Sequence, residues 1–127
     1  MAKIKIAPNP TFKAKVQIPR VGGDAVAVDF EFKYLDRIAL SALFDRWNTA
    51  RDEHATKVQD EGMSWQDATA SEIALQVNQL KDIVSGWGFD DKLSDESMTA
   101  LVTSCIGAPQ AVLDAYQAAY KPARLGN

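Results

Sequence analysis

Cysteine and histidine are scarce in this chain of 127 residues, which has one of each, Cys105 and His54. A lone cysteine excludes an internal disulfide and agrees with a reducing compartment. One residue of each kind cannot supply the usual ligand set of a zinc site. A catalytic pair would require both, yet Cys105 falls on the expected apolar face of a helix and His54 falls in a polar stretch. We therefore expect no metal site and no Cys/His chemistry.

Long apolar runs are missing too, and the longest ones are far below the roughly 20 residues that cross a bilayer. We therefore expect no membrane partner. The opening MAKIKIAPNP lacks the apolar core of a secretory signal, so the chain should stay in the cytosol. Gly22-Gly23 has no phosphate-loop pattern around it, and Ser41 and Ser104 lack a G-x-S-x-G context. With no cofactor motif and no catalytic group, a binding or assembly role is favoured over an enzyme.

The composition is that of one globular domain with a short extension at each end. Hydrophobic residues make up 46% and charged residues 24%, and a chain of this length buries roughly two thirds of its unfolded surface around one core. We expect a basic N-terminal arm at residues 1–10, a single globular domain at 11–120 and a flexible C-terminal tail at 121–127. The last helix should end at Tyr120, because Pro122 prevents it from continuing.

Acidic residues are absent from the first twenty positions, although the whole chain has a net charge of −3. The basic residues there are Lys3, Lys5, Lys13, Lys15 and Arg20. The segment is either a solvated strand face with an arm, or a basic arm that binds an acidic surface on another copy and favours head-to-tail self-association. The four lysines are the residues that we predict for such an arm. A nucleic-acid site is the weakest interpretation, because no DNA-binding or RNA-binding motif accompanies them.

Two stretches near the N-terminus alternate between apolar and polar residues. TFKAKVQIP begins at Thr11, AVAVDFEFK begins at Ala25, and the intervening Gly22-Gly23 suits a tight turn. This pattern predicts a β-hairpin over residues 11–33. A lone hairpin is marginally stable in water, so its apolar face must pack on the rest of the chain.

The first two expected helices follow this hairpin. Asp36 can cap the first helix, whose apolar pattern fades in the polar stretch 51–67, which we interpret as a fraying helix end and a loop. A second helix should then run to about Ser85, with Gly86 and Gly88 placed to stop it.

Two shorter helices complete the chain. Ser94 should cap the third, which ends at Gly107, and Pro109 should open the fourth, which runs to Tyr120. The expected fold class is therefore α+β, with an N-terminal β-hairpin packed on about four α-helices, at residues 36–120, in one predominantly helical domain.

Four segments of this plan carry a family resemblance. They are the N-terminal PNPTFKAKV, the F-x-F-K before the first helix, the W-x-F-D-D before the third, and the terminal ARLGN. In this order and spacing they resemble the tail assembly chaperones of long-tailed bacteriophages over most of the chain. The stretch 51–67 matches least well, so no family property is transferred to it.

The resemblance implies a specific function in the cytoplasm of the infected bacterial host. Such chaperones bind the long tape measure protein, keep it soluble and promote polymerisation of the tail tube, with the tail tube protein as a further partner. They are absent from the mature virion, form homo-oligomers that include spirals, and are commonly also made as a longer product of ribosomal frameshifting. Leu125-Gly126-Asn127 can be encoded as CTG GGA AAC, which contains a slippery heptamer. In the longer product the tail would be a flexible linker.

Candidate contacts with the tape measure protein are the aromatic residues Trp65 and Tyr120, together with the basic residues Lys121 and Arg124 beside or within the tail. The competing interpretation for both aromatics is ordinary core packing, because aromatic side chains are mostly buried. Two other functions remain open. One is a self-assembling phage tail component that stays in the particle, and the other is a small nucleic-acid-binding regulatory module.

Overall fold

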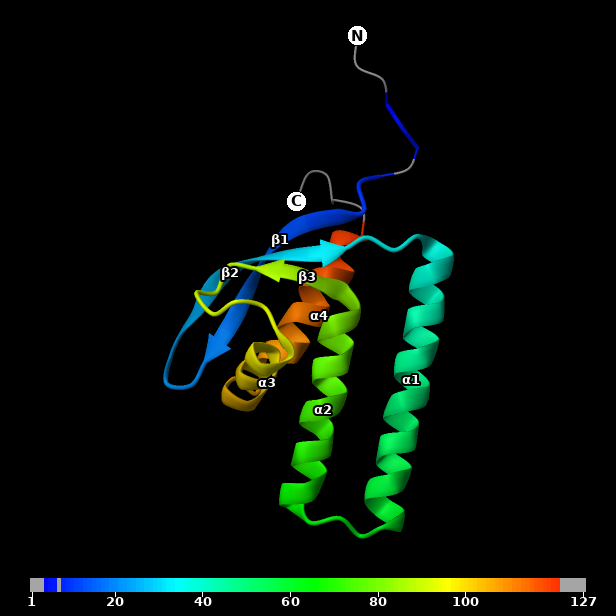
Figure 1. Cartoon of the computed structure of the whole chain (residues 1–127), viewed down its shortest axis with the longest axis vertical. Coiled ribbons are helices and arrows are strands. Elements are labelled where there is room, and N and C mark those ends of the chain that lie inside the picture. Colours follow the sequence, from blue (N-terminus) through cyan, green and yellow to red (C-terminus); the bar gives the residue numbers. More distant parts are fainter. Residues whose placement is uncertain (1–3, 7, 122–127) are drawn as a thin grey trace.

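Three strands and four helices make up the computed structural model, which describes residues 4–6 and 8–121 (Figure 1). Their order is β1 Thr11–Arg20, β2 Gly23–Lys33, α1 Arg37–Asp60, α2 Trp65–Ile83, β3 Val84–Trp87, α3 Asp95–Ser104 and α4 Ala108–Ala119. The sheet forms one end of the molecule with α3 and α4 against it, while α1 and α2 run side by side away from the sheet. The expected α+β fold class is confirmed.

The sheet has the strand order β1-β2-β3, and both pairings are antiparallel. Its hairpin register places Phe12 opposite Phe32 and Val16 opposite Val28, so that alternate apolar side chains share one face. Gly22 lies in the turn with φ of 73°, a conformation that side chains other than glycine rarely adopt.

The short strand β3 was missed by the sequence analysis, which extended the second helix to Ser85. The helix ends at Ile83, and Val84 continues in extended conformation beside β2. Gly88 then donates its backbone N–H to the carbonyl of Asp29 at 2.7 Å. Because β2 offers unpaired backbone groups here, pairing replaces the last helical turn, and Gly86 lies within the strand instead of stopping the helix.

Helix α1 is longer than its sequence pattern predicts. Our interpretation of the stretch from residue 51 as a fraying end and a loop was wrong, because α1 continues to Asp60. The cause is a bond from another element: Arg51 Nη1 donates to both carboxylate oxygens of Glu72 on α2, at 2.8 and 2.7 Å. The loop is reduced to a tight turn in which Gly62 has φ of 57°.

The helix starts that were predicted from capping residues are confirmed. Asp36 Oδ1 accepts a hydrogen bond from the N–H of Ala39 at 2.8 Å. Ser94 forms a capping box with Ser97, each side chain accepting from the other residue's backbone N–H. These bonds satisfy donors that have no partner within the helix, so local sequence fixes both boundaries.

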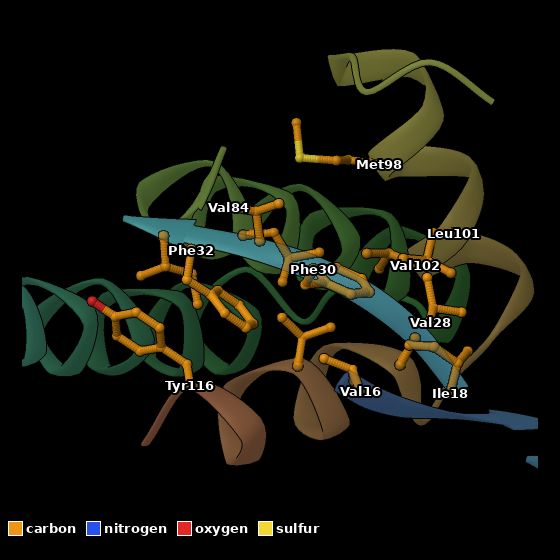
Figure 2. Packing of buried hydrophobic residues seen from close by; sticks show 14 of the residues in the cluster. Val16, Ile18, Val28, Phe30, Phe32, Val84, Met98, Leu101, Val102 and Tyr116 are labelled. Carbon is orange, nitrogen blue, oxygen red and sulfur yellow. The ribbon is translucent and has the colours of Figure 1, made fainter. Parts of the chain in front are cut away.

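The core lies between the apolar face of the sheet and helices α2, α3 and α4 (Figure 2). Its largest fully buried side chains include Tyr116 of α4 and Phe30 and Phe32 of β2, and Figure 2 shows Phe32 beside the ring of Tyr116. Helix α1 has one buried residue, Leu43, and packs mainly on α2. The α1–α2 pair therefore projects from the core as a helical hairpin (Figure 1).

Candidate functional site

An open apolar groove of about 820 Å³ lies between the far halves of α1 and α2 and the C-terminal end of α3. Its walls include His54, Val58, Met63, Trp65, Ile73 and Ile106. The first two come from the part of α1 whose sequence was interpreted as a fraying helix end and a loop. The groove therefore exists because α1 continues past Arg51 and aligns with the start of α2.

Two large apolar side chains at the groove are almost fully exposed. Trp65 is 91% exposed and Ile106 is 87% exposed. Trp65 is the first residue of α2, directly after the capping residue Ser64, and Ile106 lies in the short connection between α3 and α4. Neither fills a place in the core, and exposed apolar residues that gather at one concavity indicate a binding surface.

Two charged or chargeable residues of the groove, His54 and Glu72, lie beside each other. His54 Nδ1 lies 3.7 Å from Glu72 Oε1, and the same carboxylate is held by Arg51. The other ring nitrogen of His54, Nε2, is buried without a hydrogen-bond partner among the described residues. Cys105 caps the end of α3 and packs against the core instead of lining the groove. The arrangement suits the binding of apolar side chains more than bond-making chemistry.

Within residues 4–6 and 8–121, no group of three or more His, Cys, Asp or Glu side chains is placed to hold a metal ion. No helix in the same ranges is both long and apolar enough to cross a membrane.

The predicted partner-binding residues that the structure describes do not share one surface. Trp65 lines the groove at the far end of the helical hairpin. Tyr120 is half-buried near the sheet, where its ring stacks on Tyr34 and its hydroxyl accepts from the N–H of Leu35 at 3.0 Å. Lys121 is exposed just beyond α4, and Arg124 lies outside the described residues.

The four lysines assigned to self-association occupy two different settings. Lys3 lies outside the described residues, and Lys5 is an exposed residue of the arm. Lys13 and Lys15 are on the solvent face of β1, opposite Glu31 and Asp29 of β2 (register Lys13↔Glu31 and Lys15↔Asp29). Lys15 Nζ contacts Asp29 Oδ1 at 2.8 Å. Two of the four lysines thus face acidic partners within their own chain.

Replacing Lys15 with alanine is expected to raise the pKa of Asp29. The hydrogen bond from Lys15, then its charge, with Lys13 contributing less, holds this pKa below its ordinary value. A carboxylate with a lowered pKa adds stability above its unfolded-state pKa and loses it as pH falls through the folded-state pKa. Carboxyl carbon NMR during an acid titration measures the shift, with Lys5→Ala as the control. An unchanged Asp29 titration in Lys15→Ala would contradict the ion pair.

Ile106, Met63 and Val58 were not identified as site residues from the sequence. Val58 and Met63 lie in a polar stretch that has no stripe of apolar residues at helical spacing, and Ile106 is an isolated apolar residue before Gly107. Three elements that are distant in the sequence must come together before these side chains share a surface. Besides Trp65, which was predicted as a contact, an isolated apolar residue between two helix signals was the only trace of the site in the sequence.

The fold and the groove define a small α+β protein whose described part contains an exposed apolar concavity. Comparison with known families places it more specifically: the model of the phage tail assembly chaperones matches residues 1–127, the whole chain. The chain belongs to the phage tail assembly chaperone family. This confirms the resemblance seen in the sequence, and the family implies a non-enzymatic role with a tail-related protein partner. Comparisons with curated proteins and with solved structures found no significant match.

Proposed function

We propose that this chaperone binds the tape measure protein of its phage, keeps it soluble and promotes polymerisation of the tail tube around it. Tail assembly takes place in the cytoplasm of the infected host, and the chaperone dissociates before the virion is complete. Family membership supports the class of function. The observation that carries the choice of client surface is the groove, whose exposed Trp65 and Ile106 are unused by the core.

The chemistry of the groove fits an apolar helical client. Before the tail tube polymerises around it, a long helical protein would expose apolar side chains, and such surfaces aggregate unless they are covered. The groove offers apolar walls from three elements and a volume of about 820 Å³, enough for a few large side chains of a client helix. Many copies along one client would combine weak sites into a stable coat.

Replacing Trp65 and Ile106 together with serine is expected to abolish client binding without unfolding the chaperone. Burial of each side chain contributes about 1.5–3 kcal/mol, so the affinity for a soluble apolar segment of the tape measure protein should fall at least 100-fold, or roughly tenfold per residue. Fluorescence anisotropy with that labelled segment measures the change. Co-expression with the full tape measure protein should show a matching loss of soluble client.

The matched control is Ile38→Ser, because Ile38 is 78% exposed at the opposite end of α1 and lies outside the groove. It should bind the client as the wild type does. Equal binding by the groove variant and the wild type would overturn the assignment of the client surface. Mass spectrometry of purified virions tests the competing function, because a tail component would be abundant in them and a chaperone would be missing.

The longer frameshift product belongs to the same proposal. Its support is the family resemblance, together with the fact that residues 125–127, which lie outside the described residues, can be encoded as CTG GGA AAC. Expression of the native gene with its downstream DNA and an N-terminal tag should yield two bands on a blot. The larger band should disappear when the glycine codon is silently recoded, and a single band from the native gene would remove the hypothesis.

A further inference from the structure

We propose that the groove of one copy is occupied by the N-terminal arm of a second copy, through Ile4 and Ile6, until the client displaces it. The proposal rests on the proposed function only for the identity of the client. Self-association through the arm can be tested without any client.

The arm presents two apolar side chains that its own chain does not cover. Ile4 is 97% exposed and Ile6 is fully exposed. They alternate with Lys3 and Lys5 in the sequence, so an extended arm would place both isoleucines on one side and both lysines on the other. An arm of this kind has the shape and the chemistry of a strand that lays its apolar side into a groove.

The charges of the arm and of the helical hairpin are complementary. Residues 1–10 contain two lysines and no acidic residue, whereas residues 51–72 contain six acidic residues and two basic ones. Glu72 lies in the groove wall and Asp67 on the first turn of α2. Lysines that flank the docked isoleucines would therefore lie in a negative electrostatic potential. This potential favours docking of the arm over docking of an uncharged apolar segment.

The arm cannot reach the Trp65 end of the groove in its own chain. Pro10 is fixed beside the start of α1, because its carbonyl accepts from the N–H of Tyr34 at 2.8 Å. Ile4 can extend at most about 22 Å from there, whereas His54 lies about 27 Å along α1 from Asp36. Figure 1 places the described part of the arm at the sheet end, away from the turn between α1 and α2. Docking must therefore join two copies.

An arm in a neighbour's groove is a heterologous contact, because the two partners use different surfaces. A chain of joined copies keeps a free arm at one end and a free groove at the other, so copies add head to tail and growth depends on concentration. In this arrangement the groove is covered while no client is present. The client competes with the arm for the same apolar walls. When the client binds a groove, the arm of the neighbouring copy leaves that groove and the two copies separate.

Sedimentation velocity on four full-length proteins tests the proposal. The wild type and the control Ile38→Ser should show a mass that rises with concentration. The arm variant Ile4→Ser/Ile6→Ser and the groove variant Trp65→Ser/Ile106→Ser should each associate at least tenfold more weakly. Circular dichroism should show that both are folded, since all four substituted side chains are largely exposed.

Mixing the two variants supplies the decisive result. The arm variant retains a groove and the groove variant retains an arm, so an equimolar mixture should form a complex of two copies and stop there. A wild type that stays monomeric, a variant that associates like the wild type, or a mixture that forms no two-copy complex would overturn the proposal.

Client binding by the arm variant distinguishes failure of this proposal from failure of the proposed function. The arm variant should bind the tape measure segment at least as tightly as the wild type, because its groove is intact and uncovered. Loss of client binding in the arm variant would overturn competition between arm and client. The remaining outcome is that the wild type self-associates as described while neither the wild type nor the arm variant binds the tape measure protein. That result would overturn the proposed function alone.

Discussion

Replacing Tyr116 with alanine is expected to lower the free energy of unfolding by about 3–5 kcal/mol, the usual cost of deleting a buried aromatic ring. The side chain is fully buried, and its ring centroid lies 5.3 Å from that of Phe32 and 5.9 Å from that of Phe12. Alanine would leave a cavity where α4 packs on the hairpin. Urea unfolding followed by circular dichroism measures the loss, and an unchanged midpoint would contradict the core described here.

The hydroxyl of Tyr116 adds a smaller and separable effect. It donates to the carbonyl of Lys33 at 3.0 Å and lies 3.0 Å from the hydroxyl of Tyr120. Because its one proton goes to Lys33, Tyr120 must donate to Tyr116, while accepting from the N–H of Leu35. This relay fastens the end of α4 to the segment between β2 and α1. Tyr116→Phe should cost about 1 kcal/mol, and Tyr34→Phe is the control.

The same hydroxyl gives a pH dependence with a definite sign. Burial, followed by the hydrogen bond with Tyr120, raises the pKa of Tyr116 above its ordinary value. A raised pKa means that the stability from the neutral hydroxyl is complete below the unfolded-state pKa of about 10 and is lost as pH rises above it. The Tyr116→Phe protein should therefore lose less stability than the wild type between pH 9 and 11, roughly the range of that titration. Parallel curves for the two proteins would contradict this assignment.

Replacing Gly107 with alanine is expected to destabilise the protein by about 1–3 kcal/mol through overpacking. A Cβ at this position would lie 2.9 Å from Cγ of Pro19 and 3.4 Å from its Cβ. The proline ring cannot rotate away, so α4 or the end of β1 must shift. Since Ile106 precedes this glycine, the shift should also weaken client binding.

Two variants make the overpacking argument specific. Gly23→Ala is the control, because an added Cβ there meets no atom within 4 Å, and it should leave the unfolding midpoint nearly unchanged. The double variant Pro19→Ala/Gly107→Ala should recover most of the lost stability, because the ring that causes the clash is removed. Thermal unfolding of the wild type, Gly107→Ala, Pro19→Ala and the double variant measures the coupling. Simple additivity in the double variant would contradict the contact.

The features that could be predicted from the sequence are those that neighbouring residues determine. The hairpin follows from period-two alternation on both sides of Gly22-Gly23, and the starts of α1 and α3 follow from Asp36 and Ser94. Each signal lies within a few residues of the structure that it produces.

The features that were missed depend on distant partners. Val84–Trp87 has no strand signal of its own and becomes β3 because β2 offers an edge. The polar second half of α1 has no apolar stripe and is held by α2, as in the bond between Arg51 and Glu72. Trp65 was predicted as a contact, but the groove around it requires α1, α2 and α3 together.

The sparse attachment of α1 has a consequence for motion. Its one buried side chain is Leu43, near its start. Farther along it is held by partly buried side chains such as Trp47 and by polar bonds such as that from Trp47 Nε1 to Asp82 Oδ2 at 2.8 Å. Segments with few buried contacts open at lower free energy than the core. Backbone amides in the second half of α1 should therefore exchange with solvent sooner than those of α4. The second half of α1 forms one wall of the groove, so its easy opening allows the distance between α1 and α2 to adjust to client side chains of different size.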